Sequence, residues 1–145
     1  MLGGNHSTTW TSTYPFGHIK QEIFSPGPLS NLHPFSKGHT IIYNDVWLGQ
    51  QSTILSGIKL HSGSVVAAYA VVTRDVPPYS IVAGNPTRVV KKRFSDDLIA
   101  LLLKLRWWDQ SDIVINKLVP LLQEEPTYES IQKMYDIISN SPVPQ

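Results

Sequence analysis

A six-residue spacing of aliphatic side chains runs through the middle of the chain. Each of six consecutive units begins with one: Ile42, Leu48, Ile54, Leu60, Val66 and Val72. The fifth position of each unit carries a small or medium-sized residue: Val46, Ser52, Ile58, Ser64, Ala70 and Val76. Turn-forming residues stand between them, at 44–45, 49, 56–57 and 62–63. A regular unit of six residues is therefore the strongest constraint on the fold.

This period fits neither a helical face, which recurs at three and four residues, nor a half-buried strand, which recurs at two. Six residues suit one flat side of a parallel β-helix, with three sides in each coil. The aliphatic residue points inward, and the small residue fits the crowded corner. The units then describe about two coils, each paired through its backbone with the next. Evenly spaced strands of a β-sandwich are the alternative, but this spacing leaves no room for hairpin connections.

Composition excludes several classes of function. The 145 residues are enough for one domain, and twelve basic against eleven acidic side chains leave no basic field for nucleic acid. The absence of cysteine excludes thiolate catalysis and cysteine-based zinc sites. The start resembles no signal peptide, and the apolar run 98–105 carries Lys104 and is too short to span a bilayer. We expect a cytoplasmic protein without membrane insertion.

Three segments carry a resemblance to a known family. Residues 39–94, ending "VVTRDVPPYSIVAGNPTRVVKKRF", resemble the closing coils of a hexapeptide-repeat (left-handed β-helix) acetyltransferase. "GGNHSTTWTSTYPF" and "RFSDDLIALLLKLRWWDQSDIVINKLVPLL" resemble the histidine segment and helical tail of its xenobiotic branch, which modifies streptogramins and chloramphenicol. The resemblance implies a mainly β fold, a single-stranded left-handed parallel β-helix over 1–86 with an inserted loop at 17–38. A mostly helical C-terminal extension follows over 87–145.

The implied activity is acetyl-CoA-dependent O-acetylation of an antibiotic or of a polysaccharide sugar, a distinction that the motifs leave open. An acceptor hydroxyl must lose its proton before it attacks a thioester, and histidine titrates in the right range to take it. The resemblance places this general base on His6. Asn5, Ser7 and Thr8 are candidates to meet the developing oxyanion, with no choice among them.

The groove for coenzyme A is expected where side chains are small. By resemblance, Ala68 contacts the pantetheine arm, and Thr73 and Arg74 lie towards the adenosine phosphates. The other expected cofactor-binding residues are Arg88, Lys91 and Gly49, since cationic side chains suit phosphate oxygens. Tyr69 either crowds this groove or points outward. We expect no metal ion, because the close pair His33 and His39 flanks a loop that bears proline and glycine.

Loop, tail and assembly complete the expectations. The loop 17–38 either covers the acceptor with Phe24, Leu29, Leu32 and Phe35 or is a surface loop. Ser95 and Thr127 are predicted to be helix N-caps. Pro120 is predicted to end or kink the segment between the two helices. The tryptophan pair at 107–108 is expected to pack in the protein rather than to contact substrate. The family's assembly implies a homotrimer with sites between subunits. The resemblance begins within the histidine segment, without the preceding coils of a complete enzyme, so a truncated, non-catalytic trimer that binds coenzyme A is the alternative.

Overall fold

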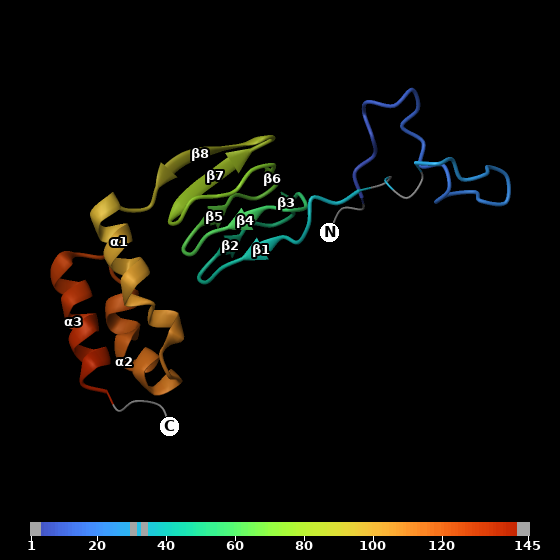
Figure 1. Ribbon diagram of the computed structural model, residues 1–145. Coiled ribbons are helices and arrows are strands. Elements are labelled where there is room, and N and C mark those ends of the chain that lie inside the picture. Colours follow the sequence, from blue (N-terminus) through green and yellow to red (C-terminus); the bar gives the residue numbers. More distant parts are fainter. Residues whose placement is uncertain (1–3, 30–31, 33–34, 142–145) are drawn as a thin grey trace.

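A computed structural model describes residues 4–29, 32 and 35–141 (Figure 1). Eight strands come first along the chain: β1 (Ile41–Ile42), β2 (Trp47–Leu48), β3 (Thr53–Ile54), β4 (Lys59–Leu60), β5 (Val65–Val66), β6 (Val71–Val72), β7 (Ser80–Gly84) and β8 (Thr87–Lys92). Four helical elements follow: α1 (Asp96–Leu105), the 3-10 turn η2 (Trp107–Asp109), α2 (Asp112–Leu122) and α3 (Tyr128–Ser139). Strands therefore form the middle of the chain and helices its C-terminal part.

Parallel pairing joins strands that are three units apart. Each of the first three strands pairs with the strand eighteen residues later, in the registers Ile41 with Lys59, Trp47 with Val65 and Thr53 with Val71. The chain thus meets itself once every eighteen residues, a segment that we call a coil. β7 continues the β2–β5 ladder in parallel, and β8 folds back on it antiparallel. The parallel stack predicted from the six-residue period is confirmed, and the sandwich alternative is wrong.

The aliphatic start of each unit faces the inside of the stack. Leu60, Val66 and Val72 have no exposed surface, so these three side chains belong to the hydrophobic core. Ile42 and Leu48 occupy equivalent positions in the first coil but remain 51% and 41% exposed. The difference arises because β1, β2 and β3 each pair on one side only within the described residues. The first coil is therefore an open end of the stack.

Corners of the stack are made by residues with left-handed backbone conformations. These residues recur every six positions: Asp45, Gln51, Gly57, Gly63 and Tyr69. Glycine adopts such φ values freely, whereas other L-residues do so at a cost. Gly57 and Gly63 stand in predicted turns, but Gln51 and Tyr69 carry no such signal. The repeat imposes the corner geometry even where the local residue disfavours it.

The helical tail has its own hydrophobic core. Ser95 and Thr127 cap α1 and α3 through their side chains, as predicted. The predicted apolar faces contribute Leu102, Leu105, Ile131 and Met134, all buried, and Trp107 packs against the same cluster. Of the two expectations for Pro120, that it ends or kinks the segment, the first is wrong, because α2 continues to Leu122. Only two residues of the helix follow the proline, so the missing N–H affects few backbone hydrogen bonds. None of the helices in the described ranges is long and apolar enough to cross a membrane.

An N-terminal excursion precedes the first coil. Figure 1 shows it projecting from the strands on the side opposite to the helices. Asn5 and Phe35 form an antiparallel bridge that closes the excursion at its base. Tyr14, Phe16 and Phe24 gather within it, with ring centroids 4.8 to 5.6 Å apart. The excursion is thus held by its two ends and by a small aromatic cluster.

Candidate functional site

His6 is held by a backbone carbonyl of its own segment. Its Nδ1 atom lies 2.9 Å from the carbonyl oxygen of Thr13. A carbonyl oxygen only accepts hydrogen bonds, so Nδ1 must be the donor. In a neutral imidazole the other nitrogen, Nε2, is then the one with a lone pair, and this is the atom that can accept a proton. The contact gives the exposed His6 ring the tautomer that a general base needs.

The residue before His6 ties the segment to the coils. Asn5 exchanges backbone hydrogen bonds with Phe35, and its side-chain amide donates to the Phe35 carbonyl at 3.2 Å. The same amide reaches Ser56 Oγ at 3.5 Å, and that hydroxyl also accepts from the backbone N–H of Lys37 at 3.2 Å. Ser56 lies in the corner that follows β3. His6 is therefore placed next to a residue that is anchored on the first coil.

Gly49 and Ala68, two of the residues predicted to line the groove, come together on adjacent coils. The Gly49 N–H donates to the Val66 carbonyl at 2.7 Å. A Cβ atom built on Gly49 would lie 2.4 Å from the backbone nitrogen of Ala68 and 2.6 Å from the carbonyl carbon of Ala67. No side chain fits between these backbones. Ala68 is exposed beside this contact, so the wall of the stack is low here.

Tyr69 points outward at this place. Its side chain is 66% exposed, and its N–H donates to the Gln50 carbonyl at 2.9 Å across the coils. Of the two placements that the sequence leaves open, the structure has the outward one.

Arg74 and Arg88 line one cavity of about 170 Å³ at the β8 end of the stack. Thr87 and Asp75 line it as well. Asp75 accepts a hydrogen bond from the Lys59 backbone at 2.8 Å, so its carboxylate is engaged with the neighbouring coil. Thr73 and Lys91 are not among the lining residues. The two predicted arginines, fourteen residues apart in sequence, therefore line the same cavity, while Thr73 and Lys91 do not.

Sequence reasoning missed Thr87 and Asp75 as neighbours of the arginines. Thr87 begins the strand that folds back on β7, and it pairs with Gly84. A signal was present in "AGNPTR", because a glycine and an asparagine–proline pair mark a tight turn before Thr87. A turn at this place brings the strand carrying Arg88 against the coil that carries Arg74.

The predicted acceptor wall is exposed. Phe24, Leu29, Leu32 and Phe35 show 38% to 58% of their surface to solvent. Phe24 contacts Tyr14 and Phe16, and Phe35 carries the bridge to Asn5. A metal site is also absent from the described ranges, where no three potential His, Asp or Glu ligands cluster. His33, one of the pair considered for a metal, lies outside the described residues.

Comparison with characterised proteins finds similar chains. The sequence is 42% identical over 125 residues to a chloramphenicol acetyltransferase of Klebsiella aerogenes, covering 84% of this chain but only 58% of the relative. It is 41% identical over 140 residues to a probable macrolide acetyltransferase of Lysinibacillus sphaericus, covering 93% of this chain and 74% of the relative. The chain thus spans a little over half the length of the first of these proteins.

Among solved structures, the chain is similar to a hexapeptide-repeat-containing acetyltransferase of Vibrio cholerae O1 biovar eltor, complexed with acetyl coenzyme A. That similarity is 38% identity over 40% of this chain and 32% of the other, with a TM-score of 0.39. No protein-family model matches the sequence.

Proposed function

Since this chain belongs to the xenobiotic branch of the hexapeptide-repeat acetyltransferases, with the chloramphenicol and macrolide enzymes among its relatives, we propose that it transfers an acetyl group from acetyl-CoA to a hydroxyl. The acceptor is an antibiotic of the chloramphenicol or streptogramin kind or a polysaccharide sugar. The hydrogen bond from His6 Nδ1 to Thr13 is the observation that supports this proposal most directly. It leaves Nε2 as the basic nitrogen of the ring.

His6 is the general base in this proposal. Its Nε2 takes the proton of the acceptor hydroxyl as the oxygen attacks the carbonyl carbon of the thioester. The new C–O ester bond forms, the C–S bond breaks, and His6 returns the proton to the departing thiolate. A donor must meet the negative charge that develops on the carbonyl oxygen, and Asn5, Ser7 and Thr8 remain the candidates. Asn5 is engaged with Phe35 and Ser56, and the Ser7 hydroxyl lies 3.2 Å from Thr9 Oγ1, so each of the three candidates has to be tested by substitution.

The co-substrate would lie along the later coils. Acetyl-CoA supplies the activated acetyl group, and the residues present fit its two ends. Half-buried Gly49 and exposed Ala68 make a low wall suited to an extended pantetheine arm. Arg74 and Arg88 share a cavity, and their guanidinium groups suit anionic phosphate oxygens. Thr73 and Lys91 are proposed to contribute from outside that cavity.

The assembly belongs to the same proposal. We infer that the coils close into a left-handed β-helix over 1–86, interrupted by the inserted loop 17–38. Residues 87–145 form a mostly helical extension, and three copies form a cytoplasmic homotrimer. Figure 1 supports sites between copies, because the excursion with His6 projects outward from its own stack. A base held on such an arm is suited to reach a groove on a neighbouring copy.

Thiol release tests the proposed activity. The purified chain is incubated with acetyl-CoA and a panel of acceptors: chloramphenicol, a streptogramin A compound, a macrolide and a galactoside. Release above the His6→Ala background with one acceptor is the expected result. If thiol release stays at that background with every acceptor, the proposal that this chain is an acetyltransferase is contradicted.

A titration with coenzyme A distinguishes the enzyme from the alternative, a non-catalytic trimer that binds coenzyme A. Binding without acetyl transfer would favour the non-catalytic trimer. Absence of both binding and transfer would contradict the proposed coenzyme A groove. Light scattering or sedimentation of the same sample reports the copy number, and a monomer would contradict sites between subunits.

A further inference from the structure

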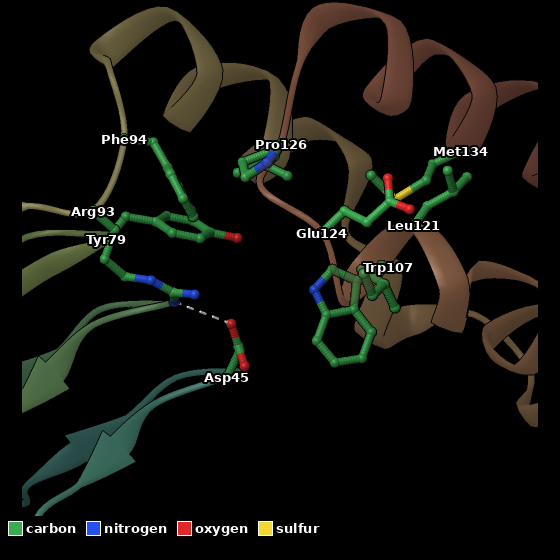
Figure 2. Close-up of a pocket in the computed structure, with 11 residues that line it drawn as sticks. Asp45, Tyr79, Arg93, Phe94, Trp107, Leu121, Glu124, Pro126 and Met134 are labelled. Atoms are coloured by element: carbon green, nitrogen blue, oxygen red, sulfur yellow. Dashed lines mark ion pairs between the residues drawn. The ribbon is translucent and has the colours of Figure 1, made fainter.

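A second cavity lies between the strands and the helical tail (Figure 2). It has a volume of about 300 Å³, at the lower end of the range for small-molecule sites (~300–1,000 Å³). Its walls come from a corner of the first coil, from the approach to β7, from the linker before α1, and from η2 and the α2–α3 connection. It shares no lining residue with the arginine cavity near β8.

The Tyr79 hydroxyl ends in this cavity without a protein partner. Tyr79 is only 2% exposed, and its backbone N–H and carbonyl are both bonded, to Ser62 and Arg93. Within the described part of the chain, no residue makes a hydrogen bond with its side-chain oxygen. Figure 2 shows that oxygen pointing into the space before Asp45 and Trp107. The hydroxyl keeps contact with the open space of the cavity, so a molecule that enters the cavity can form a hydrogen bond with it.

The tyrosine side chain cannot rotate to reach a hydrogen-bond partner elsewhere in the protein. Its ring lies against Gly63, where an added Cβ would come within 2.6 to 2.7 Å of three ring carbons. The Arg93 guanidinium covers the ring at 5.2 Å from its centroid. The phenol is therefore fixed by packing, and its hydroxyl is aimed at the cavity.

The other polar groups around this space supply both donors and acceptors. Arg93 donates to the Gly63 carbonyl at 2.8 Å and pairs with the Asp45 carboxylate at 3.5 Å, so the two charges offset each other. Figure 2 shows the indole nitrogen of Trp107 on the same side as Tyr79 and Asp45. Glu124 lines the cavity from the exposed α2–α3 connection.

From this arrangement we infer that the cavity binds a small neutral ring compound with several hydroxyl groups. Each hydroxyl both donates and accepts, which matches Tyr79, Asp45 and the Trp107 N–H. The apolar face of such a ring packs on Trp107 and Pro126. A cation fits less well, because Arg93 already occupies the place beside Asp45. This site requires neither His6 nor the coenzyme A groove.

Chemical shifts of the tryptophan indole groups provide the test. The full-length chain has four tryptophans, and Trp107→Phe identifies the Trp107 signal. The chain is titrated with myo-inositol, cyclohexanol and cyclohexylamine. We expect inositol to shift the Trp107 signal and to bind more tightly than the other two. Tyr79→Phe removes only the hydroxyl, and one lost hydrogen bond should weaken inositol binding by about tenfold.

Tyr43→Phe is the matched control. It also removes one phenol hydroxyl, but Tyr43 stacks on His61 at 5.0 Å and does not line the cavity, so its inositol affinity should be unchanged. Thermal melting establishes that both variants are folded. An unmoved Trp107 signal, equal affinity in Tyr79→Phe and the unaltered chain, or tighter binding of cyclohexylamine than of inositol would each overturn the inference.

Discussion

The Nδ1 atom of His6 donates to the carbonyl oxygen of Thr13 across seven residues of the N-terminal excursion. The acceptor is part of the backbone, so no side-chain substitution at position 13 removes it. The bond holds both the direction of the ring and the position of its proton. A histidine held in this way differs from one that merely lies near a terminus, because Nε2 is the nitrogen that carries the lone pair of its neutral ring.

Replacement of His6 tests the role of this second nitrogen. His6→Asn keeps a donor near the position of Nδ1 and removes Nε2, whereas His6→Ala removes both. We expect either change to lower kcat by about 10²–10⁴-fold, the usual contribution of a general base. Coenzyme A affinity should stay unchanged, as measured by calorimetry. Activity retained in His6→Asn would show that Nε2 takes no proton.

Gly49→Ala should damage both stability and the proposed groove. The new methyl group would meet backbone atoms of Ala67 and Ala68, which cannot rotate out of its way. We expect a loss of about 1–3 kcal/mol in the free energy of unfolding, together with weaker coenzyme A binding. Gly27→Ala is the matched control, because nothing lies within 4 Å of its added Cβ. Equal urea midpoints for the two variants would contradict the close approach.

The arginine cavity makes a prediction about the phosphates of the co-substrate. Arg74→Gln and Arg88→Gln should each weaken coenzyme A binding by about tenfold to a hundredfold, since each removes charge-assisted hydrogen bonds. The binding should also become less sensitive to salt. Lys117→Gln removes one exposed positive charge from α2 and serves as the control for net charge. A similar loss in Lys117→Gln would indicate a general field effect.

Arg93 should contribute to stability well beyond its charge. It bonds the Gly63 carbonyl, pairs with Asp45 and covers the rings of Tyr79 and Phe94. We expect Arg93→Ala to cost about 2–4 kcal/mol in unfolding experiments, and Arg93→Lys to restore little because lysine lacks the planar fork. Lys92→Ala is the neighbouring control: its pair with Asp96 is exposed and should contribute less than about 1 kcal/mol. Full rescue by lysine would reduce the role of Arg93 to its charge.

Alkaline pH should destabilise the protein through Tyr79. Burial raises the pKa of this phenol to about 12, with the Asp45 carboxylate adding to the rise and Arg93 opposing it. Because the folded pKa is the higher one, the unfolded chain loses its proton first, from about pH 10 upward. Stability is then fully present below pH 10 and falls between pH 10 and about 12.

Tyr79→Phe isolates this effect. The variant cannot ionise at position 79, so the difference in unfolding free energy between it and the unaltered chain should shift in favour of the variant as the pH rises through this range. Asp45, Arg93 and Glu124 face the same cavity in both proteins and cancel in the comparison. A difference that stays constant with pH would contradict the raised pKa.

The six-residue repeat could be predicted from the sequence because its pattern lies in residues that are close together in the chain. Leu60, Val66 and Val72 were predicted to be inward from spacing alone, and each is fully buried. The corner conformations of Gln51 and Tyr69 were beyond such reasoning, since neither residue favours a positive φ. They follow from the stacking of coils, which local propensity does not describe.

The site was predictable in part for the same reason. Gly49 stands one coil, eighteen residues, before Ala67, so the period places it against the peptide bond that joins Ala67 to Ala68. The meeting of Arg74 with Arg88 depends on the turn before Thr87, and the cavity at Tyr79 depends on how the tail docks against the first coil. Neither docking nor the Asn5–Phe35 bridge has a periodic signal, and both join residues far apart in the chain.

The open end of the stack has a consequence for the timing of local motion. In an array whose coils touch only their neighbours, the end member opens at the lowest free energy, so amide hydrogens of β1–β3 should exchange with solvent sooner than those of β5–β7. His6 is connected to that end through Asn5, whose side-chain amide donates a hydrogen bond to Ser56. A ligand or a second copy of the chain that covers Ile42 and Leu48 would make local unfolding of the first coil rarer. It would thereby stabilise the position of His6 without contacting it. The coil whose amide hydrogens are least protected from exchange is therefore the one that positions the proposed base, His6.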